Sequence, residues 1–223
     1  FTYGDGYGNP APVQTSVWDR APYSAYRNSA WRSTASFSYA NDTSGNWCLG
    51  LPVSSTVTNT APEQVAITRS TTYVADTVAC RITRQVVEPG IPALRVVSTF
   101  GFDDCGNLNS IQVVGAHPKG TPMAARTTSF HYGTRCQLPE TATNALAQTT
   151  SYTWRYDFGV PTSATDANGL STTWTHDEFG RRSSETASDG TRTTREYQSC
   201  GAGPCWGMND LRFAVYDRRY GAD

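Results

Sequence analysis

SYTWRYDFG, residues 151–159, decides the fold of this chain, because its pattern returns as TTWTHDEFG at residues 172–180. In both stretches rings stand two residues apart, as Tyr152, Trp154 and Tyr156 do in the first. Residues two apart share one face of a β-strand, and the threonines between the rings suit a solvated opposite face. Asp followed by Gly then favours a tight turn. Each stretch therefore predicts a strand that ends in a turn.

A return strand follows each turn, and the pair repeats along the chain. His176 lies 20 residues after Tyr156, with Glu178 as an extra residue in the second copy, and Tyr197 lies 21 residues after His176. Asn168-Gly169 between them is a strong hairpin signal. One unit is a β-hairpin of about 20 residues, which is marginal in water alone, so neighbouring hairpins must pack on it. We expect an all-β chain of tandem antiparallel hairpins with little helix, since no segment shows a convincing 3.6-residue period.

Looser copies of the unit precede these two, for example at residues 100–108 and 130–136, and more weakly at 1–9 and 37–57. The intervals between copies lengthen towards the N-terminus. We expect one continuous array in two parts, with divergent hairpins and longer connections over residues 1–94 and regular repeats with a cysteine-containing loop over 95–223. The residues that define the repeat are Phe102, Asp103, Gly106, Tyr132, Tyr156, Asp157, Gly159, His176, Asp177, Gly180, Arg181 and Tyr197.

The pattern aromatic-x-Tyr-Asp-x-x-Gly-Arg at this spacing resembles the YD repeats of the RHS type, with Trp174 to Arg181 as the best match. The resemblance is strongest over residues 95–200. It implies a curved β-ribbon that forms part of a hollow shell. In bacterial RHS proteins and in the BC subunits of Tc toxins, such a shell holds a C-terminal toxin domain. The family's self-cleavage motif near the end of the shell core has no match here.

The composition of the 223 residues excludes several classes of protein. A net charge of -1 argues against a nucleic-acid groove and against a polybasic membrane patch. No apolar run approaches the ~18–20 residues of a membrane-spanning helix. Charged residues are 17% and aromatic residues 12% of the chain. Together with the abundant Thr and Ser, this composition favours strands.

The six cysteines predict disulfides and an oxidising compartment, because their number is even and their spacing is wide. No C-x-x-C occurs, so the spacing does not suit zinc. Cys105 and Cys136 occupy near-equivalent turn positions of adjacent hairpins, and Cys200 and Cys205 bracket a flexible four-residue loop. The pairs we expect are Cys105–Cys136, Cys200–Cys205 and Cys48–Cys80.

The recurring carboxylates invite a catalytic interpretation, which we weigh against turn formation. Asp103, Asp157, Asp177 and Asp189 stand at repeat positions, and Asp is the best residue for bonding its own turn backbone. The Asp- and Asn-containing turns lack the six to eight oxygens of a calcium site. No nucleophile motif is present, and the six tryptophans spread along the chain suit packing better than a sugar-binding face. We expect no catalytic residue, no cofactor and no metal site.

The sequence therefore predicts a non-catalytic structural segment of a secreted or cell-surface bacterial RHS protein. We expect its partners to be the remainder of a longer parent chain and the enclosed toxin domain, without nucleic acid and without a membrane span. The alternative is a cell-surface adhesin or carbohydrate-binding repeat module, with a glycan as partner.

Overall fold

The computed structural model describes residues 3–21, 23–199 and 213–221. They fall into two compact units, Phe1–Thr127 and Thr128–Asp223. The two units are groups of residues that contact one another, whereas the expected boundary between residues 94 and 95 separates divergent from regular repeats. That boundary stays a prediction. Among the described residues the one helical element is a 3-10 turn, η1, at Pro92–Leu94. The prediction of an all-β chain with little helix is confirmed.

Fifteen strands make up the described part of the chain. The first unit contains β1 (Val13–Trp18), β2 (Ala30–Ala40), β3 (Leu51–Thr60), β4 (Ile67–Asp76), β5 (Arg81–Val87), β6 (Val96–Phe102) and β7 (Leu108–Val114). The second contains β8 (Arg126–Tyr132), which begins at the boundary, β9 (Pro139–Thr143), β10 (Thr149–Arg155), β11 (Val160–Thr165), β12 (Ser171–His176), β13 (Arg182–Thr186), β14 (Arg192–Ser199) and β15 (Phe213–Tyr220).

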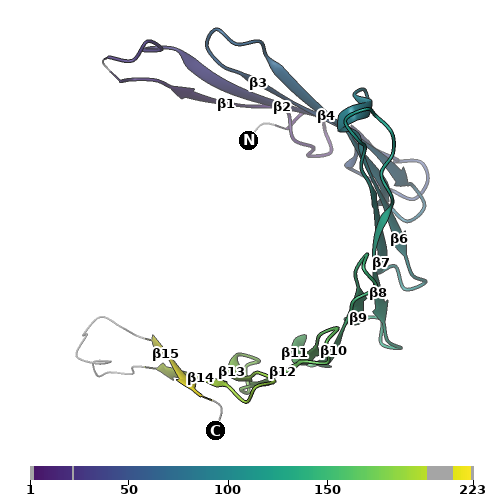
Figure 1. The fold of residues 1–223 in the computed structure, drawn as a ribbon. Helices are drawn as coiled ribbons and strands as arrows, with labels where there is room; N and C mark the ends of the chain where they lie inside the picture. Colours follow the sequence, from purple (N-terminus) through teal and green to yellow (C-terminus); the bar gives the residue numbers. More distant parts are fainter. Residues whose placement is uncertain (1–2, 22, 200–212, 222–223) are drawn as a thin grey trace. The chain divides into compact units, whose positions relative to one another are not determined.

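Within each unit every strand pairs antiparallel with the next strand along the chain (Figure 1). The alternation of side chains explains the pairing. In β12, for example, Trp174 is half-buried between Thr173 and Thr175, which are exposed. This order of sequential hairpins is the one that the repeat predicts.

A bulge recurs near the end of the first strand of six hairpins, in strands β2, β4, β6, β8, β10 and β12. In each case the return strand contributes one extra residue. In the hairpin of β12 and β13, Thr175 lies opposite Ser184 and His176 lies opposite Arg182, so Ser183 is the extra residue. The Thr175 hydroxyl lies 2.8 Å from that of Ser183 and 2.7 Å from that of Ser184. Such bulges increase the local twist of a hairpin.

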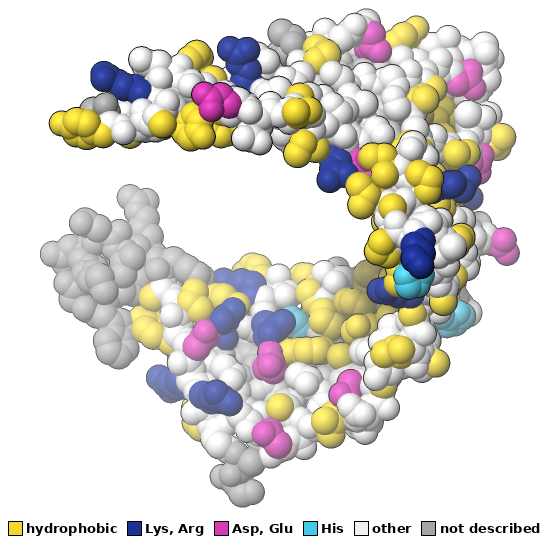
Figure 2. All heavy atoms as spheres, turned by 45° about the horizontal axis from the view of Figure 1, so that its top comes forward, with side chains coloured by type: hydrophobic (Ala, Val, Ile, Leu, Met, Phe, Trp, Pro, Cys, Tyr) yellow, Lys and Arg dark blue, Asp and Glu magenta, His cyan; other side chains and the backbone are white. Residues whose placement is uncertain are grey.

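Neither unit encloses a conventional hydrophobic core in the described residues. The buried hydrophobic side chains are Cys48, Leu51 and Val86, with exposed fractions of 1%, 8% and 7%, and all three belong to the first unit. Hydrophobic side chains instead lie on the surface among polar ones (Figure 2). The sheet is therefore a single layer, and most of its side chains are half-buried.

No helix in the part of the chain that the structure describes has the length and apolar character needed to cross a membrane.

Candidate functional site

A five-residue turn recurs at the hairpin ends, and the sequence-predicted residues Asp103, Gly106, Asp177, Gly180 and Arg181 lie in two of these turns. In six turns the first residue bonds the fifth through its backbone, and the fourth residue has a positive φ and bonds the first. This is a three-residue loop of the kind that contains a type I turn and one left-handed residue. The turns run from residues 103, 117, 144, 166, 177 and 187 to residues 107, 121, 148, 170, 181 and 191.

Asp177 shows how the side chain completes this turn. Its carboxylate accepts hydrogen bonds from the backbone N–H groups of Phe179 and Arg181, both at 2.9 Å, and from the Nε of Arg181 at 2.7 Å. Gly180 has a φ of 74°, and a Cβ there would lie 2.7 Å from the ring of Phe158. Position 180 thus favours glycine both for its backbone conformation and for the close approach of a neighbouring hairpin.

The turn carboxylates are held in the ionised form. Burial alone would raise the pKa of Asp177, but hydrogen bonds from Arg181 and Phe179 lower it below its usual value. The backbone N–H of Leu170 likewise lowers the pKa of Asp166, against a smaller opposing effect of burial. A general acid needs a raised pKa, so these two groups are tuned as acceptors for the turn rather than for acid catalysis.

Asp157 departs from the expected role. Arg155 pairs with Val160 across four residues, whereas His176 pairs with Arg182 across five, so the hairpin end that contains Asp157 is one residue shorter than the one that contains Asp177. The Asp157 carboxylate instead forms an ion pair with Arg155, the last residue of β10, at 3.1 Å from its Nε. The expectation that Asp157 bonds the turn backbone as Asp177 does was wrong, because the missing residue moves it one position into the loop. Tyr156, expected on the strand face, also lies in this loop.

The other repeat-defining rings mark the ends of strands. Phe102, Tyr132 and His176 are the last residues of β6, β8 and β12, each directly after a bulge. Tyr197 lies inside β14, two residues before its last residue, Ser199. The Tyr-Asp position is thus a strand end next to a turn in three of the copies.

Arginine side chains cover these rings from the preceding hairpin. The guanidinium carbon of Arg81 lies 4.1 Å from the ring centre of Phe102, and that of Arg135 lies 4.5 Å from the ring centre of Tyr156. Both pairs are 21 residues apart, which is one repeat. Arg181 similarly lies 4.3 Å from the ring centre of Tyr197. Planar guanidinium groups stack well on aromatic faces, so these contacts join each hairpin to the next along the edge where the turns lie.

His176 is a strand-end residue with no catalytic setting. Its Nδ1 is buried without a hydrogen-bond partner. Burial, and then the positive charges of Arg182 and Arg155, lower the pKa of His176 below its usual value. The neutral ring fits a packed position at the turn edge. The buried carboxylate of Glu88 is also accounted for, since it accepts a hydrogen bond from the backbone N–H of Ser70 at 3.0 Å.

The cysteines divide into three groups. Cys48 and Cys80 form a disulfide with a Cα–Cα distance of 5.1 Å, the pair expected from the sequence. Cys105 and Cys136 are also disulfide-bonded, and their pairing with each other stays a prediction. Cys200 and Cys205 lie outside the described residues.

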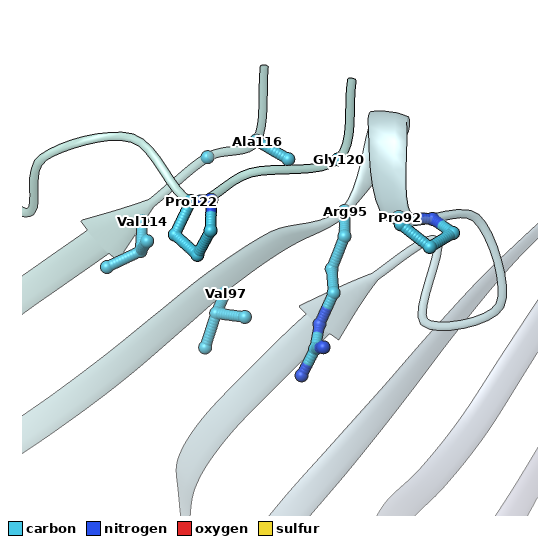
Figure 3. A pocket seen from close by; sticks show the side chains of 8 residues that line it. Pro92, Arg95, Val97, Val114, Ala116, Gly120 and Pro122 are labelled. Carbon is cyan, nitrogen blue, oxygen red and sulfur yellow. The ribbon is translucent and has the colours of Figure 1, made fainter. Parts of the chain in front are cut away.

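Two hollows in the first unit offer space for a ligand. One, of about 210 Å³, lies between η1 and the segment after β7. Figure 3 shows Pro92 and Pro122 at its sides, Val97 and Val114 along the strands, and Arg95 as its charged side chain. It contains no acid–base pair. No group of three metal-ligating side chains occurs among the residues that the structure describes.

The second hollow, of about 420 Å³, lies over the first four strands. Its lining combines Trp31 and exposed aliphatic residues with the amides of Asn59 and Gln64. Neither hollow could be predicted from the sequence, because each depends on how separate strands and loops meet.

A known repeat covers the regular turns. The family model described as RHS Repeat matches residues 159–193. This chain contains an RHS repeat. The matched segment spans β11 to the start of β14 and includes the turns at Asp166 and Asp177. The YD-like pattern from Trp174 to Arg181 and the turns that begin at Asp166 and Asp177 therefore lie within this repeat.

One solved structure shares this fold at low sequence identity. The crystal structure of TcdB2-TccC3-TEV matches with a TM-score of 0.54 and 12% identity, over 95% of this chain and 11% of that chain. The crystal structure of TcdB2-TccC3 matches with a TM-score of 0.44 and 12% identity, over 77% of this chain and 9% of that chain. This chain thus spans about a tenth of the length of the larger proteins. No curated protein sequence matches it.

Proposed function

We propose that this chain is a non-catalytic wall segment of a secreted bacterial RHS-repeat shell that encloses a C-terminal toxin domain. The observation that carries the proposal is the single-layer sheet, whose second unit buries no hydrophobic side chain among its described residues. A sheet is stable when a face is covered by another layer or when many repeats share their contacts. This segment therefore suits a place within a longer array of repeats.

The polar side chains of the strands support a wall whose faces are exposed to water. Hydroxyl pairs cross neighbouring strands at Thr143 and Thr149, at Thr153 and Thr162, and at Thr165 and Ser171. Such pairs satisfy polar groups without presenting charge. A polar surface of low charge density holds an unfolded chain without binding it tightly, as a cargo enclosure requires.

The expected oxidising compartment also agrees with this role. The Cys48–Cys80 disulfide joins the connection after β2 to the turn before β5. Disulfides form and persist outside the cytosol, which fits a secreted or cell-surface protein.

Protease protection of the full-length parent tests the proposal. We expect the C-terminal domain of the intact parent to be digested much more slowly than the same domain expressed alone. Equal rates of digestion would contradict the shell. A glycan array would then test the alternative, a cell-surface adhesin or carbohydrate-binding repeat module.

A further inference from the structure

The smaller of the two hollows, of about 210 Å³, has an apolar floor built by neighbouring strands. Val97 of β6 lies opposite Val114 of β7 and, on its other side, opposite Val86 of β5. Val86 is buried, with 7% of its surface exposed. Residues paired in this way share one face of a sheet, so the three valines form a continuous apolar row. Because β5 and β6 are each paired on both sides, this floor is not a sheet edge.

The connection after β7 forms a small hairpin that closes one side of the hollow. Ala116 and Pro122 pair across this hairpin. At its tip, a Cβ on Gly120 would lie 2.9 Å from the Cβ of Pro92 in η1, so the tip packs directly on η1. Figure 3 shows Pro122 and Pro92 on opposite sides of Val97. The walls are therefore held by contacts within the chain, as in a binding site that is formed before its ligand arrives.

Arg95 is the charged residue among those that the structure places around the hollow. Its backbone is extended, with a φ of -67° and a ψ of 126°, and it lies two residues before Val97. Both side chains therefore project to the same face of the sheet. None of the described residues that line the hollow is acidic, and the ion pairs of the described residues do not include Arg95. Its exposed guanidinium is thus available to an anion from outside the chain.

The size of the hollow limits what it can hold. An apolar cavity of roughly 150 Å³ is large enough for benzene, whereas sites for drug-sized ligands have about 300–1,000 Å³. The volume of about 210 Å³ therefore suits one aromatic ring with a short arm, and a nucleotide or an oligosaccharide is too large. The valine and proline side chains also favour an aromatic ring over a sugar ring, because they offer no hydrogen-bond partner to hydroxyl groups.

We propose that this hollow binds a small aromatic monocarboxylate. The ring lies against Val97, Val114 and Pro122, and the carboxylate accepts two parallel hydrogen bonds from the guanidinium of Arg95. A planar guanidinium matches a carboxylate in this bidentate geometry. Burial of the ring removes water from one side of the ion pair, so the two contacts strengthen each other. The proposal concerns a ligand of the wall and does not rest on what the wall encloses.

Titration of phenylacetate into the wild-type chain tests the site, with the amide NMR signals as the readout. We expect saturable shifts for residues 93–97 and 114–121. Phenylacetamide has the same ring without the charge, and acetate has the charge without the ring. We expect each of them to bind at least about tenfold more weakly than phenylacetate. Equal affinities for phenylacetate and phenylacetamide, or shifts that do not saturate, would overturn the proposal.

Two arginine variants locate the carboxylate. Arg95→Gln removes the charge and keeps most of the length of the side chain. We expect its affinity for phenylacetate to fall about tenfold and its affinity for phenylacetamide to stay the same. Arg32→Gln is the matched control, because Arg32 is an exposed arginine beside the second hollow, and we expect both affinities to be unchanged. Equal losses in the two variants, or no loss in Arg95→Gln, would refute the role of Arg95.

A third variant tests the hollow itself. Val97→Phe places a ring on the floor and occupies the room of the ligand, so we expect it to weaken phenylacetate and phenylacetamide by the same factor. An affinity for phenylacetate that survives Val97→Phe would place the ligand elsewhere and contradict the proposal. All of these titrations use the chain of 223 residues by itself, so their outcome is separate from that of the protease test of the shell.

Discussion

Asp103, Asp166 and Asp177 accept hydrogen bonds from the backbone of their own turns. Asp103 accepts hydrogen bonds from the backbone N–H groups of Cys105 at 3.0 Å and Asn107 at 2.8 Å, as Asp177 and Asp166 do in their turns. At Asn144 an amide oxygen takes the same two bonds. The repeated Asp is therefore explained by turn geometry, and a search for paired catalytic carboxylates has no geometric support at these positions.

Replacement of two aspartates distinguishes a turn residue from a surface ion pair. Asp177→Ala removes the acceptor of two backbone N–H groups, so we expect a fall in melting temperature of about 3–6 °C. Asp157→Ala removes a contact with Arg155 at the surface, and we expect a much smaller change. Thermal unfolding followed by circular dichroism measures both. Similar losses in the two variants would show that Asp157 does support its turn.

Three kinds of contact join the hairpins to one another. Backbone pairing links consecutive strands, arginines cover the rings of the next hairpin, and a disulfide bridges distant turns. Cys48 is almost completely buried, and the sequence separation between Cys48 and Cys80 is 32 residues. The disulfide thus closes a loop that contains the whole of β3 and β4, in a unit with few buried hydrophobic residues.

Removal of this disulfide tests its contribution to the stability of the first unit. We expect the double variant Cys48→Ser, Cys80→Ser to lose about 3 kcal/mol of unfolding free energy, because a closed loop of this length restricts the unfolded chain. Urea denaturation of the variant and the wild-type chain measures the loss. An unchanged midpoint would mean that strand pairing alone holds this part of the unit.

The whole molecule is organised as sheet without a second layer in the described residues. Exposed and half-buried side chains alternate in strands such as β10, from Thr149 to Trp154, and few side chains of the described residues are fully buried. Little apolar surface is therefore removed from water within either unit. Stability then depends on backbone pairing, on turns and on contacts between successive hairpins. This is the property that separates a repeat segment from a globular domain of the same length.

The dependence of stability on urea checks this organisation. The slope m increases with the surface that unfolding exposes. We expect the m-value of this chain, summed over its unfolding transitions, to be smaller than the m-value of a compact monomeric β-protein of about 220 residues measured in parallel. An equal or larger value would indicate that the units bury a layer of side chains in solution.

The hairpins, their order and the chemistry of most turns follow from the amino-acid sequence alone. Asp177, Gly180 and the alternation around Trp174 act within a few residues of one another, so their effect is local and readable from spacing. This is why the all-β fold and the antiparallel repeat could be predicted. The Asp157 turn could not, since one residue fewer in a loop changes which side chain reaches the backbone.

The bulges and the arginine contacts are defined only in the folded chain. The extra residue Ser183 is defined by its pairing with Thr175 and His176 on another strand. Arg81 reaches Phe102 only because neighbouring hairpins bring residues 21 positions apart together. Each of these features is a relation between separate strands, which the spacing of residues along one strand does not specify.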